Sequence, residues 1–251
     1  MSITHHPENI QDMYAWQTTV ATYDVGPDRL LTPSAQLRLQ QEAGERHFRE
    51  GGLDFEGIAA LGMAFVVLQN NAVIYRRPRM GEDITLKTWS RTIKGVRFYR
   101  CYRFEDSEGK VLIDSMATFA LVDLHTHAML RPTAFPYEIK EQTFEHTCAD
   151  APRLRMPAEK TPCGVHTVRA SELDFNGHLN NTRYADIVFD HLPQTVCEHL
   201  QGFSIVFQHE AKHGETVDLF TAEDEQGLYI QAVNGDTPCF TALVKVESYC
   251  T

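Results

Sequence analysis

Hydrophobic and polar positions alternate in short runs along much of the chain, and a spacing of two predicts β-strands. In the first half, strand-like runs fall at residues 16–23, 64–75, 83–92, 95–105 and 111–124. The segment from Thr32 to Glu50 differs, because Thr32 can cap a helix, Pro33 suits its first turn, and Gly51-Gly52 end a partly apolar helical stripe. The first half is therefore predicted to contain a strand, one helix and then several long strands.

The second half repeats this order. A short strand is predicted at 164–169, a helix at 181–192 capped by Asn180 or Asn181, and strands at 203–208, 216–222, 228–233 and 240–248. The segments Gly81-Glu-Asp-Ile-Thr-Leu86 and Gly214-Glu-Thr-Val-Asp-Leu219 occupy equivalent places in the two halves. The pattern predicts two α+β units, in each of which a curved sheet wraps a largely buried helix.

A proline-rich segment joins the two halves. It runs from about residue 131 to 162 and has the composition of a linker, with a short helix expected near Tyr137–His146.

Composition narrows the function classes. The chain has 251 residues, of which 43% are hydrophobic and 23% charged, and its net charge of −11 argues against general affinity for nucleic acid or anionic lipid. The six scattered cysteines resemble reduced thiols rather than a disulfide frame. The N-terminus lacks a secretory signal, and no apolar run approaches the roughly 18 residues of a membrane span. These features favour a cytoplasmic protein.

Basic residues nevertheless gather in one segment that contains only Glu82 and Asp83 as acids. They are Arg76, Arg77, Arg79, Lys87, Arg91, Lys94, Arg97, Arg100 and Arg103. Such a segment is either a solvated edge or outer face of a sheet, or a docking surface for an acidic partner.

The densest group of polar side chains lies in Glu172-Leu-Asp-Phe-Asn-Gly-His-Leu-Asn-Asn-Thr-Arg-Tyr184. In an extended segment Asp174, Asn176 and His178 would point to one side, just ahead of a helix whose first N–H groups lack intrahelical partners. An acid, an amide and an imidazole placed there can hold a water molecule against a carbonyl group. The alternatives are that Asp174 and Asn176 cap a loop and that His178 is structural.

Residues Asp174 to Tyr184 resemble the signature Asp-x-Asn-x-His-x-Asn-Asn, followed by Tyr, of the acyl-acyl-carrier-protein (acyl-ACP) thioesterases of plants and bacteria. The similarity extends over nearly the whole chain. It implies an α+β tandem double hotdog, with two antiparallel β-sheets that each wrap around a central α-helix. We therefore expect an N-terminal hotdog domain at 1–137, an inter-domain linker at 138–162 and a C-terminal hotdog domain at 163–251 that carries the catalytic motif.

The family also has a Glu-Cys pair on the strand after this helix. Here Glu210 is retained but Ala211 replaces the cysteine, which excludes a cysteine nucleophile at this position. The resemblance thus adds Glu210 to the candidate catalytic residues. We expect His178 or Glu210 to take a proton from water and Asn176 to position the water or the carbonyl, while Asp174 orients its neighbours or serves as the base itself.

The predicted function is hydrolysis of fatty acyl-ACP to free fatty acid and carrier protein, which terminates chain elongation without a cofactor or a metal. Acyl carrier protein is acidic, so the basic segment is a candidate docking surface, with Arg153, Arg155 and Lys160 as a second candidate. The acyl chain needs an apolar cavity along a central helix, lined in part by Phe65 and Val67. A homodimer is compatible but not required, since fused units can supply the face-to-face sheet pairing that single-hotdog proteins obtain by dimerising.

Three alternatives stay open: an acyl-CoA thioesterase of the same fold, a hotdog dehydratase, and a non-catalytic acyl-binding hotdog protein. Other candidate sites are weaker. His125 and His127 could contribute two metal ligands, but no cluster of cysteines or carboxylates completes the site. Cys163 and Cys197 lie outside any nucleophile motif.

Overall fold

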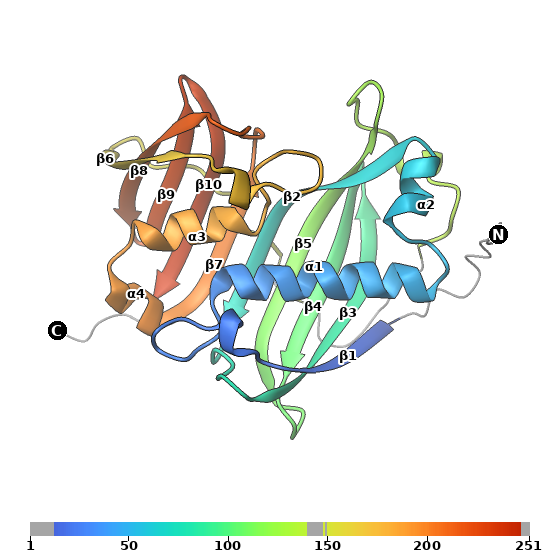
Figure 1. Ribbon diagram of the computed structural model, residues 1–251, viewed down its shortest axis with the longest axis horizontal. Coiled ribbons are helices and arrows are strands. Elements are labelled where there is room, and N and C mark those ends of the chain that lie inside the picture. Colours follow the sequence, from blue (N-terminus) through green and yellow to red (C-terminus); the bar gives the residue numbers. More distant parts are fainter. Residues whose placement is uncertain (1–12, 140–147, 149, 247–251) are drawn as a thin grey trace.

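The computed structural model describes residues 13–139, 148 and 150–246, and its elements follow the duplicated order (Figure 1). The first half contains β1 (Met13–Thr19), α1 (Pro33–Glu50), α2 (Phe55–Ala60), β2 (Met63–Ile74), β3 (Asp83–Lys94), β4 (Arg97–Glu105) and β5 (Val111–Asp123). The second half contains β6 (Thr161–Thr167), α3 (Arg183–Asp190), α4 (Gln194–Glu198), β7 (Leu200–Phe207), β8 (Thr216–Asp224), β9 (Gly227–Asn234) and β10 (Thr237–Val246).

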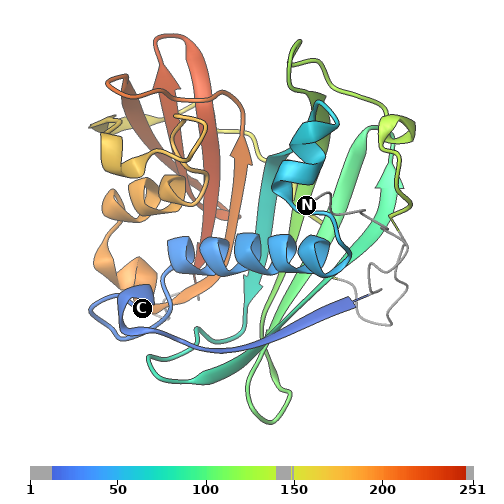
Figure 2. The ribbon, with the colours of Figure 1, turned by 45° about the vertical axis from the view of Figure 1, so that its right-hand side comes forward.

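The strands form one ten-stranded antiparallel sheet in the order β1-β3-β4-β5-β2-β7-β10-β9-β8-β6. Each half has the same internal order, and the halves meet where β2 pairs with β7, with Asn71 opposite Ser204. The expectation of face-to-face pairing was therefore wrong: the two sheets join edge to edge, so that backbone hydrogen bonds saturate an edge strand of each unit. Both Figures 1 and 2 show α1 and α3 on the same side of this continuous sheet.

Backbone hydrogen bonds confirm the duplication residue by residue. The N–H of Val20 donates to the Glu82 carbonyl at 2.9 Å, and the N–H of Val168 donates to the Glu215 carbonyl at 2.9 Å. One loop further along, the isolated bridge between Leu30 and Arg79 is repeated as the bridge between His178 and Lys212. The loop that carries the polar motif thus has a counterpart in the first half.

Helix α1 begins and ends as the sequence predicts. The Thr32 hydroxyl accepts a hydrogen bond from the N–H of Ala35 at 3.2 Å, Pro33 is the first helical residue, and the helix stops at Gly51. Its inner face is buried, as expected for a helix wrapped by a sheet. In the second half, α3 is much shorter, and its N-cap is Thr182 rather than Asn180 or Asn181.

The structure also contains short helices that periodicity did not reveal. Helix α2 has six residues, of which Gly57 is a poor helix former, and it is held by the Asp54 carboxylate, which accepts from the Gly57 N–H at 2.8 Å. The helix expected near Tyr137–His146 falls mainly on residues 140–146, outside the described residues. Within the described ranges, no helix is long and apolar enough to cross a membrane.

Candidate active site

The polar motif forms a tight turn, not the extended segment that we expected. Oδ1 of Asp174 accepts hydrogen bonds from the N–H groups of Asn176 at 2.9 Å and His178 at 3.1 Å. The N–H of Asp174 in turn donates to the His178 carbonyl at 2.8 Å, and Gly177 takes a positive φ of 80°. Asp174 therefore fixes the loop through Oδ1, which leaves Oδ2 for other contacts.

The turn brings His178 beside Glu210. The bridge between His178 and Lys212, together with a 2.9 Å hydrogen bond from the Leu179 N–H to the Ala211 carbonyl, aligns the loop with the segment after β7. Nε2 of His178 consequently lies 3.3 Å from a carboxylate oxygen of Glu210, with side-chain exposures of 30% and 63%. A proton on Nε2 can be donated to Glu210, and Nδ1 is then the basic nitrogen of the imidazole.

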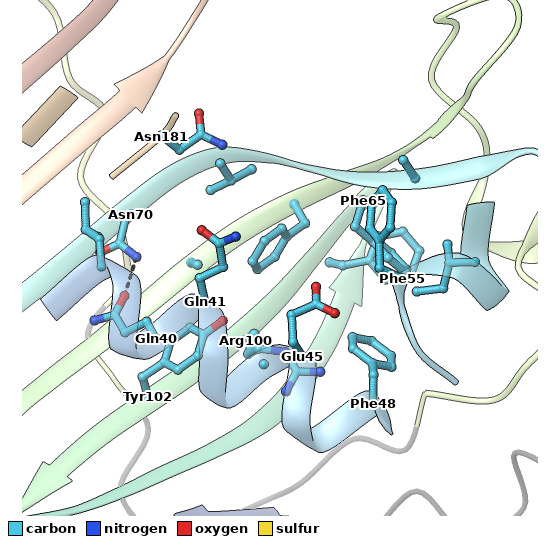
Figure 3. Close-up of a pocket in the computed structure, with 18 of the residues that line it drawn as sticks. Gln40, Gln41, Glu45, Phe48, Phe55, Phe65, Asn70, Arg100, Tyr102 and Asn181 are labelled. Atoms are coloured by element: carbon cyan, nitrogen blue, oxygen red, sulfur yellow. Dashed lines mark hydrogen bonds between the residues drawn. The ribbon is translucent and has the colours of Figure 1, made fainter. Parts of the chain in front are cut away.

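A cavity of about 990 Å³ lies beside this loop. Asp174 and Asn176 line it, together with residues of α1, β2 and β4, so the cavity lies between the two halves (Figure 3). Phe65 and Val67 belong to the lining, as the sequence predicted, whereas His178 and Glu210 do not. The loop therefore presents an acid and an amide to the cavity, and the imidazole–carboxylate pair belongs to the same loop region outside the lining.

One lining residue of the motif escaped the sequence analysis. Phe175, between the two polar positions, is 72% exposed and meets Phe55 of α2 edge to face at a centroid distance of 4.7 Å. This contact joins the second-half loop that carries the candidate catalytic residues to the first half, across the cavity. Only its place inside the motif could have signalled it, because an aromatic residue between two polar ones is ordinary in a strand pattern.

The start of α3 differs from the expected oxyanion site. Asn180 Oδ1 accepts from the Thr182 N–H at 2.9 Å, and the Asn180 carbonyl accepts from the Arg183 N–H at 2.8 Å. Two N–H groups at the helix start are therefore already bonded within the chain, and the Asn176 side chain is the better candidate donor to an oxyanion. Behind the loop, burial raises the pKa of Tyr184, which remains a neutral phenol packed on Phe207 and Phe240.

The basic segment is mostly neutralised within the fold. Its paired members are Arg76 with Glu82, Arg77 with Asp28, Lys87 with Glu105, Arg91 with Asp150, and Arg103 with Asp114. Arg100 is buried and cannot form part of a docking surface, which corrects the expectation from the sequence. Arg79, Lys94 and Arg97 are exposed. Among the described residues, no group of three or more His, Cys, Asp or Glu side chains could hold a metal ion.

Comparisons with known proteins agree with this architecture. A family model described as the acyl-ACP thioesterase N-terminal domain matches residues 11–139, and one described as the C-terminal domain matches residues 157–239. Oleoyl-acyl carrier protein thioesterase 1, chloroplastic, of Arabidopsis thaliana is 24% identical over 234 residues, which cover 83% of this chain and 63% of that relative. The chain thus spans a little under two thirds of the length of this relative.

Solved structures share the fold at low identity. An acyl-ACP thioesterase from Bacteroides thetaiotaomicron superposes with a TM-score of 0.79 at 18% identity, covering 96% of this chain and all of that one. The 12:0-ACP thioesterase from Umbellularia californica gives a TM-score of 0.73 at 18% identity, covering 94% and 98%. These matches confirm the double hotdog. With both family models matching in chain order over most of its length, this chain belongs to the acyl-ACP thioesterase family.

Proposed function

We propose that this protein hydrolyses fatty acyl-ACP to a free fatty acid and the carrier protein. The observation that carries the proposal is the 3.3 Å imidazole–carboxylate pair of His178 and Glu210 on a loop that borders a cavity of about 990 Å³. Relatives named as acyl-ACP thioesterases support the choice of substrate. The cavity is large enough for an acyl chain, because ligand cavities usually span about 300–1,000 Å³.

The loop suggests how each group acts. Nδ1 of His178 takes a proton from water while Glu210 stabilises the imidazolium that forms. The water oxygen attacks the thioester carbonyl, and the Asn176 amide donates to the developing oxyanion. When the C–S bond breaks, the imidazolium returns its proton to the departing thiolate. Asp174 holds the turn, and Ala211 offers no nucleophile, so the proposed route has no acyl-enzyme intermediate.

A matched substrate series tests this function. We expect kcat/KM for acyl-ACP to exceed that for acyl-CoA, and for a small thioester of the same acyl chain, by about tenfold or more. Only the carrier protein can make protein–protein contacts with a docking surface on the enzyme. Equal or faster hydrolysis of acyl-CoA would assign the same fold to a CoA thioesterase. Binding of fatty acid without hydrolysis of any thioester would identify an acyl-binding protein, and hydration of an enoyl thioester a dehydratase.

For the docking surface we propose the turn between β3 and β4. Lys94 and Arg97 are exposed there, while Ile93 and Phe98 on either side line the cavity. The turn therefore places positive charge at the rim of the cavity, where it can attract an acidic carrier. The second candidate keeps Arg153 and Arg155 exposed, but Lys160 donates to Gln231 at 2.8 Å and lies over Phe220.

Charge reversal separates the two surfaces. The double variant Lys94→Glu/Arg97→Glu is expected to lower kcat/KM for acyl-ACP about tenfold at low salt and to leave the small thioester unaffected. The matched control is Arg153→Glu/Arg155→Glu, measured on the same substrates. A loss confined to the control pair would move docking to that surface, and equal losses on both substrates would point to a folding defect instead of docking.

A further inference from the structure

The wall of the cavity is not uniformly apolar, as a tunnel for a plain hydrocarbon would be. Along α1 and β4 the lining changes from polar to ionic and then to aromatic residues, and along β2 from polar to aliphatic and then to aromatic residues. The residues are Gln40, Glu45 and Phe48 on α1, Tyr102, Arg100 and Phe98 on β4, and Asn70, Val67 and Phe65 on β2.

Contacts between the elements show that these gradients run in parallel. At one end Asn70 donates to Gln40 at 2.7 Å. At the other end Phe65 lies 5.0 Å from Phe98 and 6.0 Å from Phe48, centroid to centroid. Figure 3 shows the polar pair and the aromatic cluster at opposite sides of the cavity, with the side chains of Glu45 and Arg100 between them.

Arg100 is a buried cation. It is 6% exposed, and Nη1 contacts Nδ1 of His47 at 2.9 Å and the Thr88 hydroxyl at 3.3 Å. None of the ion pairs among the described residues includes Arg100, and its guanidinium stacks over Phe48 at 4.8 Å. A guanidinium stays charged in proteins, and a buried charge is costly unless its hydrogen-bond donors are occupied.

Two further polar side chains line the cavity. The carboxyl of Glu45 is half-buried, and burial raises its pKa against the opposing effect of Arg49 and Arg100. The Tyr102 hydroxyl packs against Gly44, where a Cβ would come within 3.3 Å of it, and burial raises the pKa of Tyr102 to about 12. The cavity lining thus contains a cationic donor, an acceptor and a neutral hydroxyl.

A saturated hydrocarbon would satisfy none of these groups and would strip water from them. A second carboxylate would be repelled by Glu45, and a ketone has no hydrogen to donate to it. A hydroxyl both donates and accepts, so it can accept from Arg100 and donate to Glu45.

We propose that the preferred substrates are acyl chains that carry a hydroxyl group, which Arg100 and Glu45 bind inside the cavity. This proposal rests on the proposed thioesterase function and specifies its substrate class. Arg100 and Glu45 are then specificity residues, and the aromatic cluster beyond them holds the apolar part of the chain.

The test compares acyl thioesters of equal length that are unsubstituted or hydroxylated near the thioester, in mid-chain or at the far end. With wild type, at least one hydroxylated chain should have a kcat/KM about tenfold or more above the unsubstituted chain. Arg100→Met keeps the unbranched apolar stem of the side chain and removes its donors, so this ratio should fall about tenfold, to near one. Arg46→Met is the matched control, because Arg46 follows Glu45 on α1 but covers Trp16 and pairs with Glu42; it should leave the ratio unchanged.

If thermal denaturation shows that the Arg100→Met variant is not folded, Glu45→Met provides the same comparison. This substitution removes the acceptor from a half-buried position. A wild-type preference for the unsubstituted chain at all three hydroxyl positions would overturn the proposal. Binding of the free acids, measured by calorimetry, tests the hydroxyl-binding site independently of thioester hydrolysis. Tighter, Arg100-dependent binding of a hydroxylated acid in a protein that hydrolyses no thioester would sink the thioesterase proposal and retain the hydroxyl site.

Discussion

Replacement of His178 by alanine is expected to lower kcat for the preferred thioester about 10²–10⁴-fold, the range over which a positioned general base contributes. The side chain is 30% exposed and its ring contacts Glu210, so the loss should fall on catalysis and not on folding. The loop itself is held by backbone groups and by Asp174, none of which the substitution removes. Steady-state hydrolysis and the urea midpoint, measured on the same preparation, check both parts of the expectation.

The control is His213→Ala, which removes an exposed imidazole near the same segment and should leave kcat within about twofold. A second variant, Asp174→Asn, keeps Oδ1 as an acceptor for the two loop N–H groups and removes only the charge. If Asp174→Asn loses as much activity as His178→Ala while its stability is unchanged, the base is Asp174 and the role assigned to His178 is wrong.

The sequence predicts the units of the fold better than it predicts how they join. Helix α1 was located to the residue, because Thr32, Pro33 and Gly51 are local signals that act within one turn. The pairing of β2 with β7 depends on residues about 130 positions apart, such as Asn71 and Ser204, and no local pattern encodes which edges meet. The same long range explains the wrong expectation of face-to-face sheets.

The same contrast between local signals and long-range contacts applies to the candidate site. The motif located Asp174, Asn176 and His178, and the family resemblance added Glu210. The turn geometry was missed, because Gly177 permits a positive φ that alternation cannot reveal. The basic segment was overinterpreted for a related reason, since four of its members have acidic partners that lie elsewhere in the sequence or across a strand pair. Arg76 pairs with Glu82 inside the segment.

The duplication also explains why the first half carries no second copy of the site. The bridge between Leu30 and Arg79 corresponds to that between His178 and Lys212, so two residues earlier Arg77 occupies the place of Glu210. The sign of the charge is reversed, and Leu30 replaces the imidazole. Arg77 pairs with Asp28 at 2.5 Å and donates to the carbonyls of Leu30 at 3.2 Å and Leu31 at 2.9 Å. The loop that carries the candidate catalytic residues in one half therefore corresponds to a loop held by a buried ion pair in the other.

The hydrogen bonds of Arg77 also reach the second half, because its Nη1 donates to the Cys197 carbonyl of α4 at 2.8 Å. The variant Arg77→Met should therefore lower the free energy of unfolding by about 3 kcal/mol, the lower end for breaking a buried ion pair, since Asp28 keeps some contact with solvent. It should act on the whole chain, because it frees carbonyl groups in both halves. Urea unfolding followed by circular dichroism measures the change.

Arg76→Met is the control that the chain itself provides. Arg76 is the preceding residue and pairs with the Glu82 carboxylate through both Nη atoms, but its side chain is 40% exposed. Its replacement should lower the free energy of unfolding by no more than about 1 kcal/mol, because solvent screens the ion pair. If the two substitutions lower the free energy of unfolding equally, the Arg77–Asp28 pair contributes no more than an exposed surface ion pair. A clear excess at Arg77 would show that its buried contacts stabilise the fold where the first half meets α4 of the second.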